Sequence, residues 1–182
     1  MVGFCVLIWL WVCIHSSGAV LMDYYWRDYS FGEIPYDAVE VENDGKYIGR
    51  AFVDKGLLPV TIYPQLGIAI GELNGKLVLT ENIEILCTFV SNALYWDMVD
   101  IRNSSKGQSE NTIVGGFYKN WFKYFIGKIY HEGEWKVGKV LPFNNLHKGL
   151  KVWDSEGDIV PISKFYMLKY NMNLDKIPTC TN

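Results

Sequence analysis

The side chains best suited to catalysis or metal binding are few in this 182-residue sequence, and they form no recognised constellation. Beyond His15 the histidines are His131 and His147, and neither has a second His or Cys at metal-ligand spacing. Carboxylate pairs such as Asp37 and Glu40 have the residue types of a general acid and base, but they are more typical of surface charges at turns. We therefore expect a protein that is not an enzyme and that holds no metal or other cofactor.

The N-terminal segment, residues 1–19, is predicted to be a signal peptide. Residues 1–14 are an uncharged apolar run, shorter than the roughly 20 residues that a membrane span needs. Ser17 and Ala19 supply the small side chains that a signal peptidase requires, so we expect cleavage after Ala19. The run has no Lys or Arg before it, and an uncleaved anchor or a buried N-terminal strand is the alternative. The sequence thus predicts a secreted, extracellular protein with no transmembrane span.

Removal of that segment would leave two of the four cysteines, Cys87 and Cys180. In an oxidising secretory route they allow one pairing, and a disulfide between them would tie the C-terminal tail to the body of the protein. The alternative is two unpaired thiols. Asn103 begins an Asn-Ser-Ser glycosylation sequon in a polar stretch, which fits the surface of a secreted glycoprotein.

Composition and turn residues favour an all-β fold. Aromatic residues make up 15% of the sequence and are spread among Gly-containing turns, a mixture that suits strands better than helices. Asn43-Asp-Gly45 and Asn74-Gly75 are hairpin signals between short apolar runs. A formal net charge of −3 argues against nucleic acid as a partner, because phosphate binding needs a basic surface.

The strongest pattern is self-similarity along the chain. Tyr47-Ile-Gly-Arg-Ala-Phe-Val53 aligns with Phe125-Ile-Gly-Lys-Ile-Tyr-His131, and Ile83-Glu-Ile-Leu86 aligns with Phe165-Tyr-Met-Leu168. A Tyr-Trp pair precedes each copy. The sequence therefore predicts two tandem β repeats that pack with pseudo-two-fold symmetry, as a sandwich or a barrel-like body, since neither copy alone could bury its strands. The predicted units are the signal peptide 1–19, a first repeat 24–90, an opening Tyr-Trp segment and polar connection 91–111, a second repeat 112–170, and a tail 171–182.

These blocks resemble the DM-nine repeat family over nearly the whole mature chain. The matching residues include Ile34-Pro-Tyr-Asp-Ala-Val39, Asp44, Tyr47-Ile-Gly-Arg-Ala51, Gly56-Leu-Leu-Pro59 and Asn74-Gly-Lys76 in the first copy, and Ile113-Val-Gly-Gly116, Phe125-Ile-Gly-Lys128 and Val137-Gly-Lys139 in the second. The opening Tyr-Tyr-Trp-Arg-Asp-Tyr and the Leu-Pro-Val-Thr-Ile-Tyr-Pro segment are similar to the secreted arthropod members, often labelled natterin-like. The resemblance implies an all-β tandem-repeat fold and, for some members, a lectin activity.

In mannose-binding relatives an Asp and a Lys of the repeat hold the sugar hydroxyls, which suits a carboxylate acceptor and an ammonium donor. Here that pair is split between the copies. The first copy has Asp44 but Thr61 at the lysine position, and the second has Lys139 but Tyr118 at the aspartate position. Either Asp44 and Lys139 meet in one hybrid carbohydrate site, or Asp44 shapes its turn and Lys139 is an ordinary strand residue.

The resemblance therefore implies a secreted, non-catalytic, mannose-type lectin that serves recognition in innate immunity, with mannose-like glycans as partners. Two alternatives stay open. One is a secreted effector or natterin-like toxin component; the other is a structural or interaction protein that has lost sugar binding. An isologous homodimer is the commonest way for such a small lectin to gain avidity, and it remains an option here.

Overall fold

The computed structural model describes residues 23–54, 56–102, 110–119, 122–142 and 149–173, and these residues confirm the all-β prediction. They form thirteen strands in one antiparallel sheet, with a single 3-10 turn at Pro64–Leu66 and no α-helix among the described residues. The predicted signal peptide, Asn103 and Cys180 all lie outside those ranges.

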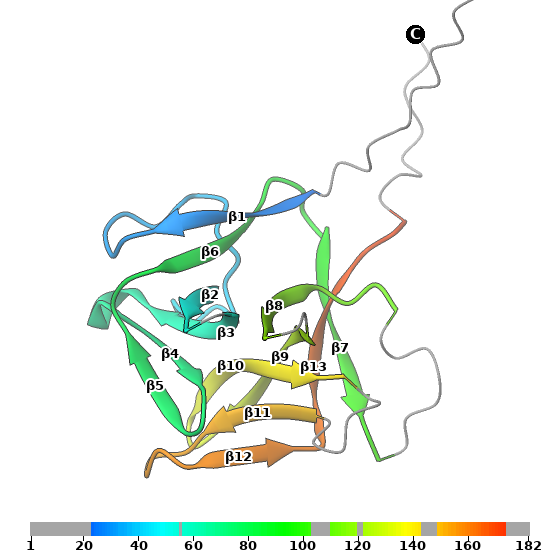
Figure 1. The fold of residues 1–182 in the computed structure, drawn as a ribbon. Helices are drawn as coiled ribbons and strands as arrows, with labels where there is room; N and C mark the ends of the chain where they lie inside the picture. The colour runs from blue at the N-terminus through cyan, green and yellow to red at the C-terminus, as the bar shows by residue number, and fades with distance from the viewer. Residues whose placement is uncertain (1–22, 55, 103–109, 120–121, 143–148, 174–182) are drawn as a thin grey trace, which may run out of the picture.

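The first half of the chain contains six strands (Figure 1). Their bounds are β1 (Tyr24–Tyr29), β2 (Tyr47–Val53), β3 (Gly56–Tyr63), β4 (Ile68–Glu72), β5 (Lys76–Leu79) and β6 (Ile83–Thr88). The second half contains β7 (Leu94–Asp100), β8 (Val114–Tyr118), β9 (Phe122–His131), β10 (Glu134–Leu141), β11 (Gly149–Trp153), β12 (Ile159–Ile162) and β13 (Lys164–Tyr170).

The two halves share one strand order. Hydrogen-bonded neighbours follow the order β1-β6-β2-β3-β4-β5 in the first half and β7-β13-β9-β10-β11-β12 in the second. Strand β8 has no counterpart in this order and links the halves by pairing with both β3 and β9. The halves also share their strand register. In the first half Arg50 lies opposite Glu84, and in the second half their aligned equivalents, Lys128 and Tyr166, lie opposite each other. Residues that align in the sequence thus occupy equivalent places in the fold.

Local sequence explains the hairpins. Asn74 and Gly75 both have positive φ, 57° and 123°, between β4 and β5, as the Asn-Gly pair predicts. Glu132 and Gly133, with φ of 50° and 83°, make a second tight turn, between β9 and β10. The hairpin tips of the two halves meet where the backbone N–H of Lys76 donates to the carbonyl of Gly157 at 2.9 Å.

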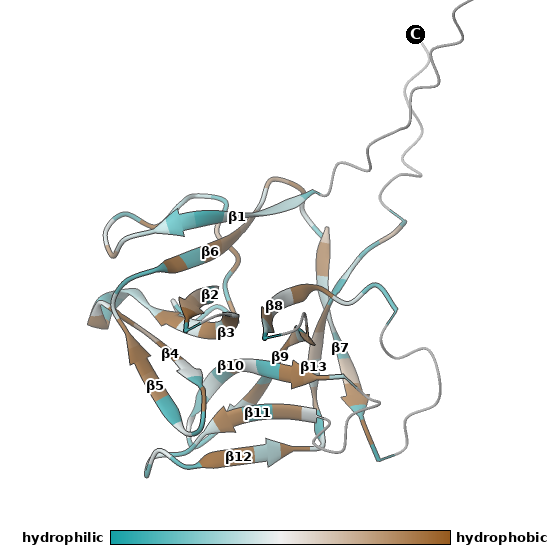
Figure 2. Ribbon diagram, viewed as in Figure 1, coloured by the Kyte–Doolittle hydropathy of each residue, from teal (hydrophilic) through white to brown (hydrophobic). Residues whose placement is uncertain are grey.

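A shared core joins the halves. One buried cluster contains Ile48 and Leu86 from the first half together with their equivalents Ile126 and Leu168 from the second. At the same junction the hydroxyl of Thr61 accepts from the backbone N–H of Val137 at 2.7 Å. Truncating a buried isoleucine of this kind costs about 2–5 kcal/mol, so neither half is expected to be stable without the other. In Figure 2, β3 is largely hydrophobic whereas β1, at the edge of the sheet, is largely polar.

Candidate functional site

The two halves place a cation on a tryptophan at equivalent positions. The guanidinium of Arg50 lies 4.4 Å from the ring centre of Trp26, and the ammonium of Lys128 lies 4.3 Å from that of Trp96. Both contacts are cation–π geometry, which contributes about 0.5–2 kcal/mol depending on burial. The Tyr-Trp pair that precedes each copy in the sequence therefore has a structural role.

In the second half aromatic rings close over the cation. Lys128 also lies 4.8 Å from the ring of Trp135 and 5.8 Å from that of Tyr166, and its side chain is only 2% exposed. Its ammonium donates to the carbonyl of Val41 at 2.8 Å and pairs with the carboxylate of Glu42. Burial lowers the pKa of Lys128 below the usual lysine value, although the Glu42 carboxylate opposes that shift. This lysine therefore fills its own aromatic cage and leaves no space for a ligand.

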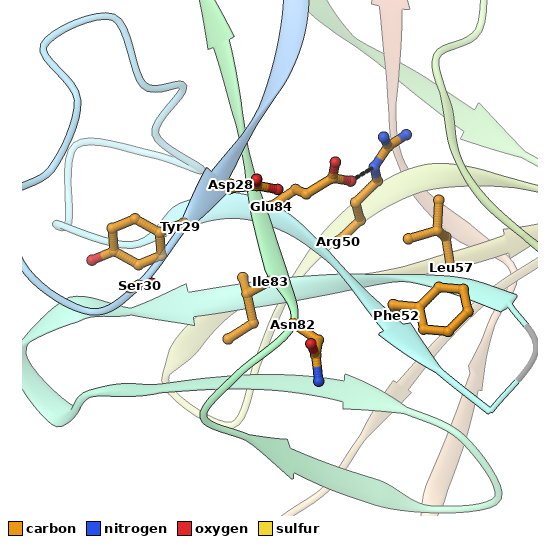
Figure 3. Close-up of a pocket in the computed structure, with 9 residues that line it drawn as sticks. All are labelled: Asp28, Tyr29, Ser30, Arg50, Phe52, Leu57, Asn82, Ile83 and Glu84. Carbon is orange, nitrogen blue, oxygen red and sulfur yellow. Dashed lines mark hydrogen bonds and ion pairs between the residues drawn. The ribbon is translucent and has the colours of Figure 1, made fainter.

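In the first half the same place is an open groove. Leu57 lies opposite Phe52, just as Trp135 lies opposite Tyr130 in the second half, so Leu57 occupies the position of Trp135. In the same way Glu84 occupies the position of Tyr166. Two large rings are thus replaced by a smaller side chain and a carboxylate. The resulting groove has a volume of about 620 Å³ (Figure 3). Its nine lining residues are Asp28, Tyr29, Ser30, Arg50, Phe52, Leu57, Asn82, Ile83 and Glu84.

The groove carries the groups that bind polyhydroxylated molecules. Asp28 and Glu84 are direct partners across β1 and β6, and Glu84 forms an ion pair with Arg50, which Figure 3 draws between them. Phe52 is 55% exposed, so its ring is accessible for stacking. Carboxylates accept hydrogen bonds from hydroxyl groups, a guanidinium donates them, and an aromatic face packs on the C–H face of a sugar ring.

Residues 40–148 match the DM9 repeat, from just before β2 to just after β10. The chain belongs to the DM9 repeat family. A search of curated proteins found no match to the chain.

In this DM9 protein, the two sugar-binding candidates from the sequence each have a separate partner. The carboxylate of Asp44 lies 2.7 Å from the ammonium of Lys46 and accepts from the Lys46 backbone N–H at 3.3 Å. Asp44 thus stabilises the turn that leads into β2. Lys139 Nζ lies 3.0 Å from Glu72 Oε2, and the two side chains are 9% and 1% exposed. Because the Lys139 ammonium is buried in that ion pair, a hybrid site would require it to exchange partners, and the hybrid site stays a prediction.

Cys87 lies in β6 with its side chain fully buried and its thiol free in the structure. Burial raises the pKa of this thiol to about 11, which makes it a poor nucleophile near neutral pH. Its predicted partner Cys180 and the sequon residue Asn103 lie outside the described residues, so the disulfide and the glycan stay predictions. Across the described part of the DM9 chain no cluster of His, Cys, Asp and Glu is arranged to hold a metal ion. No helix in that part is long and apolar enough to cross a membrane.

The groove was not predicted from the sequence. Its signal was nevertheless present, because the aligned repeats differ at Glu84 and Tyr166 within otherwise matching blocks. The second signal is the difference between Leu57 and Trp135. Leu57 lies seven residues after Arg50, and Trp135 lies seven residues after Lys128. Both signals are positions at which the first repeat has a much smaller side chain than the second, and such differences indicate where a groove can open.

Proposed function

We propose that this DM9 repeat protein is a secreted, non-catalytic carbohydrate-binding protein and that the groove of the first half holds the sugar. The observation that carries the proposal is the groove itself, where Asp28, Glu84 and Arg50 lie beside the exposed ring of Phe52. Charged hydrogen-bonding groups beside one accessible aromatic face are the residue types that orient a sugar ring.

Mannose-type glycans are the first class to test, because the sequence resembles DM9 members that bind mannose. Secretion is supported by the uncharged apolar run of residues 1–14 and by Ser17 and Ala19. An extracellular location would give such a groove access to glycans on the surfaces of other cells, in keeping with a recognition role.

The placement of the two carboxylates favours binding over hydrolysis. In glycosidases the two carboxyl groups flank the scissile bond from different sides, about 5–10 Å apart. Asp28 and Glu84 are neighbours across one pair of strands, and Arg50 engages Glu84. They therefore stand side by side on one wall of the groove, which suits two hydroxyl acceptors better than an acid and a base.

A glycan array with the mature protein tests this proposal. Phe52→Ala and Glu84→Gln should reduce binding, whereas Tyr130→Ala should leave it unchanged. Tyr130 is a matched control, because it is the equivalent of Phe52 in the second half and is 57% exposed against 55%. Binding to no glycan would remove the proposal. Binding that is lost in Asp44→Ala or Lys139→Ala but kept in the groove variants would move the site to that pair. Glycans recovered after incubation should be intact, and shortened products would indicate an enzyme.

A further inference from the structure

A second hollow adjoins the groove at the end of β1. It has a volume of about 380 Å³ and is lined by Arg27, Asp28, Tyr29, Ser30, Glu33, Ile34, Pro35 and Tyr36. Asp28, Tyr29 and Ser30 line both hollows. The two hollows therefore share the end of this edge strand, and no further strand of the described sheet lies beyond β1.

The second hollow has its own aromatic face. Tyr36 is 87% exposed, the most exposed of the large hydrophobic side chains that the structure describes. Its ring centre lies 6.1 Å from that of Phe89, which is 64% exposed and stacks on Tyr25 at 5.2 Å with 29° between the ring planes. Three neighbouring rings form a platform at this end of the molecule, and exposing such a platform to water is costly unless something covers it.

Hydrogen bonds hold the Tyr25 end of the platform in place. The hydroxyl of Tyr25 donates to the carboxylate of Asp37, and Arg27 Nη2 donates to the Tyr25 hydroxyl at 2.8 Å. Asp37 is buried, and its side chain is only 2% exposed. Since the hydrogen bonds hold Tyr25 in place and Phe89 stacks on it, these rings need little ordering when a ligand binds, which reduces the entropic cost of binding.

At Asp28 the junction between the hollows has a pair of carboxylates that the second half lacks. Asp28 lies opposite Glu84, and the equivalent position in the second half is Met98, opposite Tyr166. A ligand that crossed from one hollow to the other would meet the carboxylate of Asp28 and the hydroxyl of Ser30, which suits a polyhydroxylated chain better than an apolar one.

We propose that the ligand of the groove is an oligosaccharide, with one sugar ring against Phe52 and a following ring on Tyr36. This inference rests on the proposed function and names its substrate class: a chain of at least two linked sugars that passes over Asp28–Ser30. A monosaccharide would fill one hollow and leave the other aromatic face exposed to water. Affinity should therefore rise with chain length until both faces are covered.

The experiment measures affinity against chain length. Linear mono-, di-, tri- and tetrasaccharides of mannose, glucose, galactose and N-acetylglucosamine are titrated into the mature protein and into Tyr36→Ala, Phe52→Ala and Tyr130→Ala. In the series that binds, affinity should increase by roughly 3- to 10-fold once the chain reaches the second hollow, as expected for one additional stacked ring. Tyr36→Ala should remove this increase and leave monosaccharide affinity unchanged, because Tyr36 does not line the first groove.

Phe52→Ala should weaken every chain length alike, and Tyr130→Ala should match the unsubstituted protein. Monosaccharide binding with no gain for longer chains would overturn the second subsite and leave the proposed function standing. A gain that persists in Tyr36→Ala would show that the chain extends in another direction and would overturn its placement on the platform. Absence of binding in all four series would overturn this inference and the proposed function together.

Discussion

Leu57→Trp should abolish glycan binding without unfolding the protein. This change gives the first half the side chain that Trp135 provides at the equivalent position of the second half, where it closes over Lys128. It removes no hydrogen-bonding group from the groove. Lost binding would therefore report occupation of the space and not the loss of a sugar contact.

The expected effect on stability follows from burial. Leu57 is half-buried at the groove wall, and a tryptophan in its place would cover about 60–80 Å² more apolar surface, worth about 2 kcal/mol. A new contact with the Arg50 guanidinium adds about 0.5–1 kcal/mol. Imperfect fit against Phe52 and Ile83 offsets about 1–3 kcal/mol of this. The free energy of unfolding should therefore stay within about 1–2 kcal/mol of its original value.

Binding should change far more than stability. A sugar that the new ring excludes from the groove would make neither its stacking contact nor its hydrogen bonds, which together are worth about 2 kcal/mol or more, or at least 30-fold in affinity. Titration calorimetry with the best glycan measures the affinity, and urea unfolding followed by tryptophan fluorescence measures the stability. Unchanged affinity in a folded Leu57→Trp protein would refute the groove as the site. An unfolded variant would instead refute the equivalence of Leu57 and Trp135.

Further measurements test other parts of the structure. Titration with the best glycan should give one site per chain and not two, because aromatic rings close the groove's equivalent around Lys128; a stoichiometry of two would contradict this. Lys128→Ala should lower the free energy of unfolding in urea by about 3 kcal/mol, since it empties the cage and unpairs Glu42, whereas exposed Lys76→Ala should change it by less than about 0.5 kcal/mol. Burial lowers the pKa of Lys128 in the folded protein below the usual lysine value of about 10.4. Between these two pKa values Lys128 is protonated in the unfolded chain but has lost its proton in the folded protein, so folding becomes more favourable as pH rises. The stability difference between the original protein and Lys128→Ala should therefore grow as pH rises through that range, and a constant difference would argue against the shift. In reduced protein at pH 8 the Cys87 thiol, fully buried with its pKa raised to about 11, should react with a thiol reagent only at the rate of unfolding; fast labelling of the native state would contradict its burial.

The fold could be predicted from the sequence because its signals are local or repeated. Asn74-Gly75 specifies a hairpin through its backbone preferences, and repetition of the aromatic-Ile-Gly-basic block places equivalent strands in each half. The ion-pair partners could not be predicted in this way. Lys139 pairs with Glu72 across the boundary between the repeats, and nothing in either repeat alone identifies that partner. The position of the groove likewise depends on how Leu57 and Glu84 stand next to each other on neighbouring strands.

On one face of β6 and its counterpart β13, the fully buried position is identical in the two repeats, and the less buried position differs. In β6, Glu84 and Leu86 point to the same face, two residues apart, as do Tyr166 and Leu168 in β13. Leu86 and Leu168 both pack into the core shared by the halves, where a change in size would cost several kcal/mol, and they are identical. Glu84 is only half-buried at the groove wall, where a change costs less, and it differs in type from its counterpart Tyr166. The less buried position is the one at which the repeats differ and the groove opens, so the proposed binding site can be confined to one repeat while the core that both share stays the same.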